Sequence, residues 1–420
     1  MQTYETKAFV YHGRPGAVSS DIISFAAGPE DMVVEVILCA RCGTDKTIYK
    51  MGHKSVDQYA PVVLGHELVG KIVHVGEKVC SLQSGIGYRE GAKLSKSYLA
   101  FKIGERVTFQ SRIARYRNGL MLIPNPIANL SFQINGGYSQ YMKVPPALIR
   151  SASVLRVPDN VSDEEACLVE PSACALESIY ATPHQVGVDR RGRHLFHSGI
   201  KPGGNVCIIG SGTVGMIYAK LAFLEGAGRV VMIVRSDAKL RLAQRLLGPR
   251  LEVYQMPPMP EDDSRGIHEA EEIVVRDLQA MTDGYLFDDV IAACAASSAQ
   301  RLMLKLYTPE GYAVGACFGG THQLVDGADI DSNHYRAAKT IGTSGCSTDG
   351  MKTILEMLEK DKLDLNGFTS PERFTLDDNP HDFFSTDADG LKPVLYPSVR
   401  RLRKKATVQS IFSHRGHREF

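Results

Sequence analysis

Apolar residues in the middle of the chain form short continuous runs separated by a longer helical stretch. Val206 to Ile209 and Val230 to Val234 have the length of strands that are buried on both faces of a parallel sheet. Between them, Met216 to Leu224 is apolar at nearly every position, which is typical of a helix packed under a sheet. The order strand, helix, strand predicts an α/β fold with a doubly wound parallel sheet.

The same alternation continues toward the C-terminus. Further strands are predicted at 251–254, 288–293 and 312–316, with an amphipathic helix at 269–281. Near the N-terminus, apolar runs are instead separated by turns that contain Gly and Pro, which favours an antiparallel, barrel-like start. We therefore expect a β-rich unit followed by a parallel α/β unit.

A glycine-rich turn follows the first central strand. Gly210, Gly212 and Gly215 have the GxGxxG spacing, with Thr213 and Val214 between them. Such glycines allow a tight turn, close approach of a pyrophosphate to the backbone, and close packing of the next helix. In this setting the turn predicts dinucleotide binding, and the alternative is a purely structural glycine turn.

Side chains at three places far apart in the sequence offer metal ligands. Cys42 lies in a loop, an apolar strand delivers His66 and Glu67 side by side, and Glu170 follows another apolar run. Each of these residues taken singly can be structural, and the acidic segment before Glu170 also suits a helix start. Together, thiolate, imidazole and carboxylate are the donors of a catalytic zinc site that keeps one position open.

The order of these motifs resembles the zinc-dependent medium-chain dehydrogenase/reductase family. The sequences Cys-Gly-Thr-Asp, Gly-His-Glu and Glu-Pro precede the glycine-rich turn, and the resemblance extends from Lys7 to Pro397 with insertions. It implies a Rossmann cofactor domain with a doubly wound parallel sheet, inserted in a β-rich GroES-like catalytic domain. Alcohol dehydrogenases of this family carry a cysteine at the place of Glu170. Glutamate at this place resembles the polyol (sorbitol) dehydrogenase and sugar-phosphate reductase branch.

The resemblance also implies domain boundaries. The GroES-like catalytic domain would begin with residues 1–177 and return with 339–397, on either side of a Rossmann nucleotide-binding domain at 178–338. Residues 398–420 form a basic tail outside the pattern, which we expect to be disordered.

By the same resemblance, Cys42, His66 and Glu170 would hold one catalytic zinc ion per chain, with Glu67 as a further ligand or as the group that exchanges with water. Thr44 would relay the proton of the alcohol. The family's usual histidine at the end of this relay is missing, because Thr47 stands in its place.

The family often carries a second, structural zinc ion on four closely spaced cysteines between the Gly-His-Glu motif and the Glu-Pro motif. Only Cys80 and Cys167 fall in that interval here. We therefore expect no structural zinc.

Cofactor preference depends on the end of the second central strand. Val234 occupies the place where an acidic residue would accept the ribose hydroxyls of NAD, and Arg235 and Ser236 follow it. A neutral residue beside an arginine suits the 2′-phosphate of NADP. We expect NADP, while Asp237 keeps NAD open if the strand runs longer.

Two segments depart from the family pattern near these motifs. The first contains Arg112, Arg115 and Arg117, which form either a solvated face or a grip on an anionic substrate such as a phosphate. The second, 182–198, contains three histidines amid arginines, and its irregular spacing predicts a surface loop rather than a metal site.

Composition narrows the class of partner. The 420 residues include 48 Lys and Arg against 47 Asp and Glu, so charge favours neither nucleic acid nor a membrane surface. The nine cysteines are scattered along the chain, apart from Cys39 and Cys42, which are three positions apart. Scattered thiols suit a reducing cytoplasm better than a disulfide framework. No signal peptide or membrane span is recognisable. The resemblance implies a homodimer or homotetramer.

We therefore predict hydride transfer between NAD(P) and a secondary alcohol or ketone, such as that of a polyol, sugar, cyclitol or sugar phosphate. Two alternatives remain: a zinc-free quinone or enoyl reductase, or a non-catalytic nucleotide-binding redox sensor on the same fold. Metal content distinguishes the zinc enzyme from both.

Overall fold

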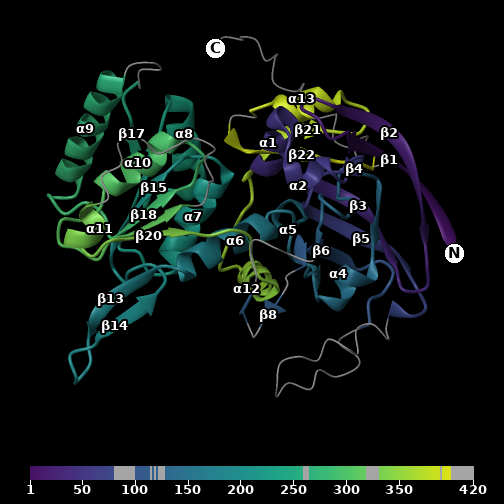
Figure 1. Ribbon diagram of the computed structural model, residues 1–420, viewed down its shortest axis with the longest axis horizontal. Coiled ribbons are helices and arrows are strands. Elements are labelled where there is room, and N and C mark those ends of the chain that lie inside the picture. Colours follow the sequence, from purple (N-terminus) through teal and green to yellow (C-terminus); the bar gives the residue numbers. More distant parts are fainter. Residues whose placement is uncertain are drawn as a thin grey trace, which may run out of the picture.

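A computed structural model shows the chain as two lobes joined by helices (Figure 1). The described residues are 1–79, 100–113, 116–117, 120–121, 128–258, 264–317, 331–387 and 390–398.

The first lobe is built from mostly antiparallel strands of the N-terminal part, closed by strands from the C-terminal part. Its larger sheet has the order β12-β6-β5-β3-β22-β21, with β11 also paired to β3, and a smaller sheet has the order β2-β1-β4. The strands are β1 (Gln2–Tyr11), β2 (Val18–Ala27), β3 (Met32–Ala40), β4 (Val62–Val63), β5 (Glu67–Val75), β6 (Arg106–Phe109), β11 (Tyr141–Val144), β12 (Val154–Arg156), β21 (Thr369–Phe374) and β22 (Lys392–Leu395).

Short elements complete this lobe. They are the helices α1 (Gly43–Met51), α2 (Lys54–Asp57), α4 (Pro146–Arg150), α5 (Asp163–Ala166) and α13 (Pro380–Ser385), and the strands β7 (Arg112–Ile113), β8 (Tyr116–Arg117), β9 (Leu120–Met121) and β10 (Ala128–Asn129). The core contains clustered aromatic rings from distant segments. Tyr138 meets Phe383 and Phe384 edge to face, with ring centroids 5.1 and 5.6 Å apart, an arrangement that aromatic pairs prefer. The return segment is thereby packed into the N-terminal lobe.

The second lobe is a parallel sheet, as predicted. Its order is β17-β16-β15-β18-β19-β20, and each neighbouring pair is parallel. The strands are β15 (Asn205–Ile209), β16 (Arg229–Val234), β17 (Glu252–Gln255), β18 (Asp289–Ala292), β19 (Val314–Cys317) and β20 (Lys339–Gly342). The expected domain boundary at residue 339 falls before β20, whereas this strand hydrogen-bonds to β19 and so belongs to the parallel sheet.

Helices cover both faces of the parallel sheet (Figure 1). One face packs against α7 (Thr213–Leu224) and α8 (Asp237–Leu247), and the other packs against α9 (Ser264–Met281) and α10 (Ser297–Lys305). A shorter helix, α11 (Asp331–Tyr335), precedes β20. Among the described helices, none is both long and apolar enough to cross a bilayer.

Two further helices lie between the lobes. They are α6 (Val169–Tyr180) and α12 (Thr348–Glu359), and they share one apolar core with α7 and with strands of both sheets. Because α6 contacts both lobes, a side chain near its start can lie between them.

The segment 182–198 is a β-hairpin rather than the predicted loop. Strands β13 (Pro183–Val188) and β14 (His194–Ser198) pair antiparallel and extend away from the sheet (Figure 1). The prediction also gave its histidines no acidic partner, yet His184 is buried and its Nε2 lies 2.7 Å from Asp289 Oδ1. Asp289 is distant in sequence, so spacing within the segment could not reveal this pair.

Candidate active site

Cys42 is held at the start of α1 by a local capping arrangement. Its sulfur accepts from the Thr44 backbone N–H at 3.5 Å, and its own N–H donates to the Asp45 carboxylate at 3.2 Å. This reciprocal pattern satisfies backbone groups that a helix start leaves unpaired. The Cys-Gly-Thr-Asp sequence therefore fixes the thiol at the end of β3.

His66 and Glu67 lie where the chain passes from β4 into β5. His66 is 9% exposed and Glu67 is 1% exposed. One ligand atom each of Cys42, His66 and Glu67 lies within 4.8 Å of the other two. Residues 24 positions apart in sequence thus form one group of thiol, imidazole and carboxylate, which we call the Cys42 group.

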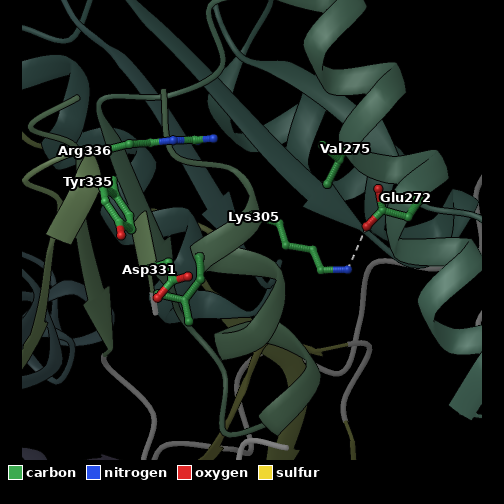
Figure 2. Close-up of a pocket in the computed structure, with 7 residues that line it drawn as sticks. Glu272, Val275, Lys305, Asp331, Tyr335 and Arg336 are labelled. Carbon is green, nitrogen blue, oxygen red and sulfur yellow. Dashed lines mark hydrogen bonds and ion pairs between the residues drawn. The ribbon is translucent and has the colours of Figure 1, made fainter. Parts of the chain in front are cut away.

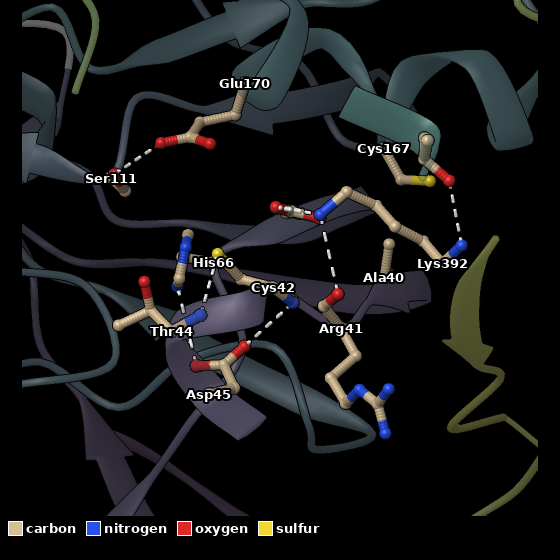
Figure 3. A network of polar contacts seen from close by, with 12 residues as sticks. Ala40, Arg41, Cys42, Thr44, Asp45, His66, Ser111, Cys167, Glu170 and Lys392 are labelled. Carbon is tan, nitrogen blue, oxygen red and sulfur yellow. Dashed lines mark hydrogen bonds and ion pairs between the residues drawn. The ribbon is translucent and has the colours of Figure 1, made fainter. Parts of the chain in front are cut away.

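Glu170, the predicted third zinc ligand, lies beside the Cys42 group rather than within it. It is 6% exposed at the start of α6 and accepts from the Ser111 hydroxyl at 2.9 Å. It is nevertheless close enough to interact electrostatically with His66 and Glu67. Figure 3 shows it on the side of the group opposite Asp45.

Asp45 lies behind His66. One of its oxygens, Oδ1, is 3.8 Å from His66 Nδ1, and the other accepts from the Tyr138 hydroxyl at 2.6 Å. Burial lowers the pKa of His66, but Asp45 and Cys42 raise it more, so the pKa is well above its usual value. Asp45 therefore favours positive charge at His66.

Lys392 lies next to Glu67. Its ammonium is 2.6 Å from Glu67 Oε1, and both side chains are buried. Burial raises the pKa of Glu67, although Lys392 and His66 act in the opposite direction. Glu67 Oε2 has no hydrogen-bond partner among the described residues, and a buried unpaired carboxylate oxygen is costly.

The Cys42 group therefore suits a cation. Zinc takes thiolate, imidazole and carboxylate ligands, and the unpaired oxygen of Glu67 is an acceptor that such an ion would satisfy. Asp45 lies on the side of His66 where zinc-binding histidines usually have a carboxylate. Its Oδ1 is 3.8 Å from Nδ1, and no hydrogen bond joins the two atoms, so Asp45 acts on His66 through its charge.

The glycine-rich turn has the geometry that its spacing predicts. Gly210 has φ +118°, and a Cβ on Gly215 would lie 1.9 Å from the Gly210 carbonyl oxygen, so any side chain at 215 would collide with the backbone. Helix α7 starts after Gly212 without a side-chain cap. Its first N–H groups are thus available to an anion such as a pyrophosphate.

Thr213 links the two lobes. Its buried hydroxyl donates to the Phe368 carbonyl at 2.8 Å and accepts from the Lys392 N–H at 2.9 Å. The hydroxyl is therefore engaged within the protein, while Val214 beside it is half-buried. Lys392 thus contacts Thr213 on α7 through its backbone N–H and Glu67 of the Cys42 group through its side chain.

The second central strand, β16, ends at the buried Val234. Arg235 is exposed, and Ser236 caps α8 by accepting from the Lys239 N–H. Asp237 is the first residue of α8, so the strand does not extend to it.

Other predicted residues are placed as follows. Thr44 is exposed beside Cys42, and His53 caps α2 by accepting from the Ser55 N–H at 3.3 Å. Arg112 hydrogen-bonds to Ser344. Arg115 and the side chain of Arg117 lie outside the described residues.

Comparisons with known proteins agree with this arrangement. A family model for the alcohol dehydrogenase GroES-like domain matches residues 28–87. D-arabinitol dehydrogenase 1 of Uromyces fabae is 27% identical over 222 residues, which is 52% of this chain and 51% of that protein. D-arabitol-phosphate dehydrogenase of Enterococcus avium is 24% identical over 341 residues, covering 81% of this chain and 82% of that protein.

A solved structure shares the complete fold. Galactitol-1-phosphate dehydrogenase from Escherichia coli superposes with a TM-score of 0.65 at 19% identity, covering 93% of this chain and 100% of that chain. The family model and these relatives support a zinc-dependent medium-chain dehydrogenase family for this chain. The Uromyces match spans about half of that relative's length. It therefore supports the family and does not identify a substrate.

The sequence alone indicated no role for Asp45 or Lys392. Asp45 lies within the quoted Cys-Gly-Thr-Asp motif, and Lys392 stands at the start of an otherwise apolar strand. A charged residue within such a strand signals a buried partner, but only the fold identifies that partner as Glu67.

A surface cavity lies on the parallel lobe. It has a volume of about 340 Å³, is bounded by α9, α10 and α11, and is lined by Glu272, Lys305, Asp331, Tyr335 and Arg336 (Figure 2). It contains none of the residues of the Cys42 group or of the glycine-rich turn.

Proposed function

We propose that the protein is a zinc-dependent oxidoreductase that transfers a hydride between NADP, or less readily NAD, and a secondary alcohol or ketone. The substrate class is polyols, sugars, cyclitols and their phosphates. The observation that carries the proposal is the convergence of Cys42, His66 and Glu67 within 4.8 Å. Lys392 connects that group to α7, the helix that follows the glycine-rich turn.

Cys42, His66 and Glu170 would hold one catalytic zinc ion, with Glu67 as the ligand that exchanges with water. The electrostatic interaction of Glu170 with His66 and Glu67 supports its inclusion. The chemistry that a bound zinc ion supplies is Lewis-acid polarisation of the alcohol or carbonyl oxygen. The chemistry that a bound nicotinamide supplies is acceptance or donation of the hydride.

The chain's own residues prepare this chemistry. Asp45 acts on His66 through its charge, and Lys392 offsets the charge of Glu67. In the oxidation direction the alcohol loses a hydride to the nicotinamide and a proton to the protein. The exposed Thr44 hydroxyl beside Cys42 is our candidate for the first proton acceptor in a relay to solvent.

The cofactor would lie along the start of α7, with its pyrophosphate on the backbone of Gly212, Thr213 and Val214. Arg235 and Ser236 would contact the 2′-phosphate of NADP. The end of β16 at Val234 supports this preference, because an acidic side chain at that place would favour NAD.

Phosphorylated polyols are candidate substrates alongside free polyols. The relative from Enterococcus avium is named for an arabitol phosphate, and the match covers four fifths of both chains. Arg112 is the described member of the arginine cluster, and it lies on β7 next to Ser111, the partner of Glu170. We also propose a homodimer or homotetramer, in which the free edge of β20 is available for pairing.

A zinc-free reductase and an idle nucleotide-binding sensor are the alternatives. Neither has a use for a half-buried thiol that converges with a buried imidazole and a buried carboxylate. Metal analysis of the purified protein tests the difference, since both alternatives require none.

The deciding experiment is a panel of polyols and polyol phosphates assayed with NADP and NAD, together with zinc analysis. Cys42→Ala should lose the catalytic zinc and all turnover. Cys207→Ala, a buried thiol on β15, is the matched control and should keep both. Full turnover in Cys42→Ala would overturn the proposed mechanism.

A further inference from the structure

A second set of metal-binding side chains lies beside the Cys42 group. Glu170 and Cys174 are four residues apart on α6, a spacing that places them on one face of the helix. Cys346 precedes α12, which packs against α6. One ligand atom from each of these three residues lies within 4.8 Å of the other two, and all three residues are buried.

We propose that Glu170, Cys174 and Cys346 form a second cation position, suited to zinc or another soft divalent ion. Two thiolates and one carboxylate are ligands that zinc accepts. Zinc–sulfur bonds of about 2.3 Å place two sulfurs of a tetrahedral site roughly 3.8 Å apart. The spacing in this group is therefore compatible with a common ion after small side-chain rotations.

The three residues already interact in a way that fits this position. The Cys174 thiol shares a hydrogen bond with Cys346, and Glu170 contributes negative charge to both sulfurs. Ser111 supplies one hydrogen bond to the Glu170 carboxylate. A cation would offset the charge that gathers when these acids ionise, whereas Lys392, the nearby buried ammonium, is paired with Glu67.

The second position is separate from the Cys42 group. The two thiols of the second position are not part of the Cys42 group, whereas Glu170 lies between the two positions. It interacts with His66 and Glu67 on one side and with Cys174 and Cys346 on the other. A carboxylate has two oxygens, so Glu170 can serve both positions. The inference does not depend on the proposed catalytic activity.

A disulfide is the competing use of two neighbouring cysteines. Both thiols are free in the structure. A disulfide would give no role to Glu170, whereas a metal position uses all three side chains. Binding a divalent ion would convert both thiols to thiolates and release two protons, so affinity should rise with pH.

The test is metal stoichiometry of the full chain. The protein is stripped with a chelator under reducing conditions and titrated with Zn²⁺ against a chromophoric chelator, and then with Co²⁺ to record thiolate-to-metal absorption. We expect two tight equivalents in the unsubstituted protein. Cys174→Ser and Cys346→Ser should each lose one equivalent and part of the thiolate absorption, while Cys207→Ser should lose neither.

Cys42→Ser separates this inference from the proposed function. If it loses one equivalent and Cys346→Ser loses the other, both positions exist. If only Cys42→Ser loses metal, the second position is overturned and the catalytic position stands. If only Cys346→Ser loses metal, the catalytic position is overturned and the second position stands. Circular dichroism checks folding, and Cys174→Ala or Cys346→Ala replaces a serine variant that does not fold.

Mass spectrometry of unreduced peptides settles the competing chemistry. The second cation position would be overturned by two results together. The first is a Cys174–Cys346 disulfide in protein purified without an added oxidant, and the second is that reduced protein binds no more zinc than the disulfide form.

Discussion

The Lys392 ammonium lies 2.6 Å from the Glu67 carboxylate, joining the last strand of the chain to the strand that follows the His66 loop. Both side chains are buried, so each charge depends on the other. The backbone N–H of Lys392 also donates to the Thr213 hydroxyl on α7. The closing strand therefore connects the cofactor helix to the proposed metal ligands.

Lys392→Met should destabilise the metal-free protein by roughly 3 kcal/mol, because it leaves Glu67 as a buried, unpaired charge. Urea unfolding measures this free energy. Lys7→Met, which breaks the more exposed pair with Asp377, is the control and should cost about 1 kcal/mol or less. Equal losses in the two variants would mean that the buried pair has no special role.

Asp45→Asn should weaken zinc binding roughly 10- to 100-fold, because removal of a carboxylate behind a metal-binding histidine has effects of this size. Asparagine can still cap α1, so the fold should persist. Zinc competition against a chelator measures the change. Asp21→Asn, which removes an exposed partner of His12, should leave zinc affinity unaltered, and a wild-type affinity in Asp45→Asn would refute this role of Asp45.

Gly215→Ala should lower the melting temperature and abolish cofactor binding, since its Cβ would lie 1.9 Å from the Gly210 carbonyl oxygen. Thermal unfolding and quenching of protein fluorescence by NADPH measure the two effects. Gly342→Ala on β20 meets no atom within 4 Å and should behave like the unsubstituted protein. Normal NADPH binding in Gly215→Ala would contradict the proposed cofactor position.

Arg235→Asp should shift preference from NADP toward NAD by roughly 10- to 100-fold, because a hydrogen bond to a charged group contributes about 1.5–3 kcal/mol. The measurement is the ratio of kcat/KM for the two cofactors. Arg241→Asp makes the same charge change at an exposed position of α8 and should leave the ratio near its original value. If both variants shift the ratio equally, the effect is general charge rather than phosphate binding.

His184→Ala should destabilise the protein by roughly 3 kcal/mol, because it leaves Asp289 buried without its partner. His197→Ala, on the exposed strand of the same hairpin, should change stability by less than about 0.5 kcal/mol. Urea unfolding compares the two. A negligible loss in His184→Ala would show that the hairpin is not anchored through this pair.

Much of the parallel lobe could be predicted because its signals are local. The apolar runs at 206–209 and 230–234 and the GxGxxG spacing each lie within a few residues, and strand and helix periods act over the same range. The family resemblance then placed the β-rich lobe around it. The boundary at 339 was misplaced because β20 is short and alternately exposed, so its membership of the sheet rests on pairing with β19.

The site was predictable only in part. The sequence determined which chemical groups are present, since the Cys42 cap, the His66 and Glu67 pair and the glycine turn are each encoded in a few neighbouring residues. Tertiary structure alone decided which of these groups meet. It brought Lys392 to Glu67, Asp289 to His184, and Cys174 and Cys346 to Glu170, because such partners lie on separate elements whose approach depends on the packing of the whole chain.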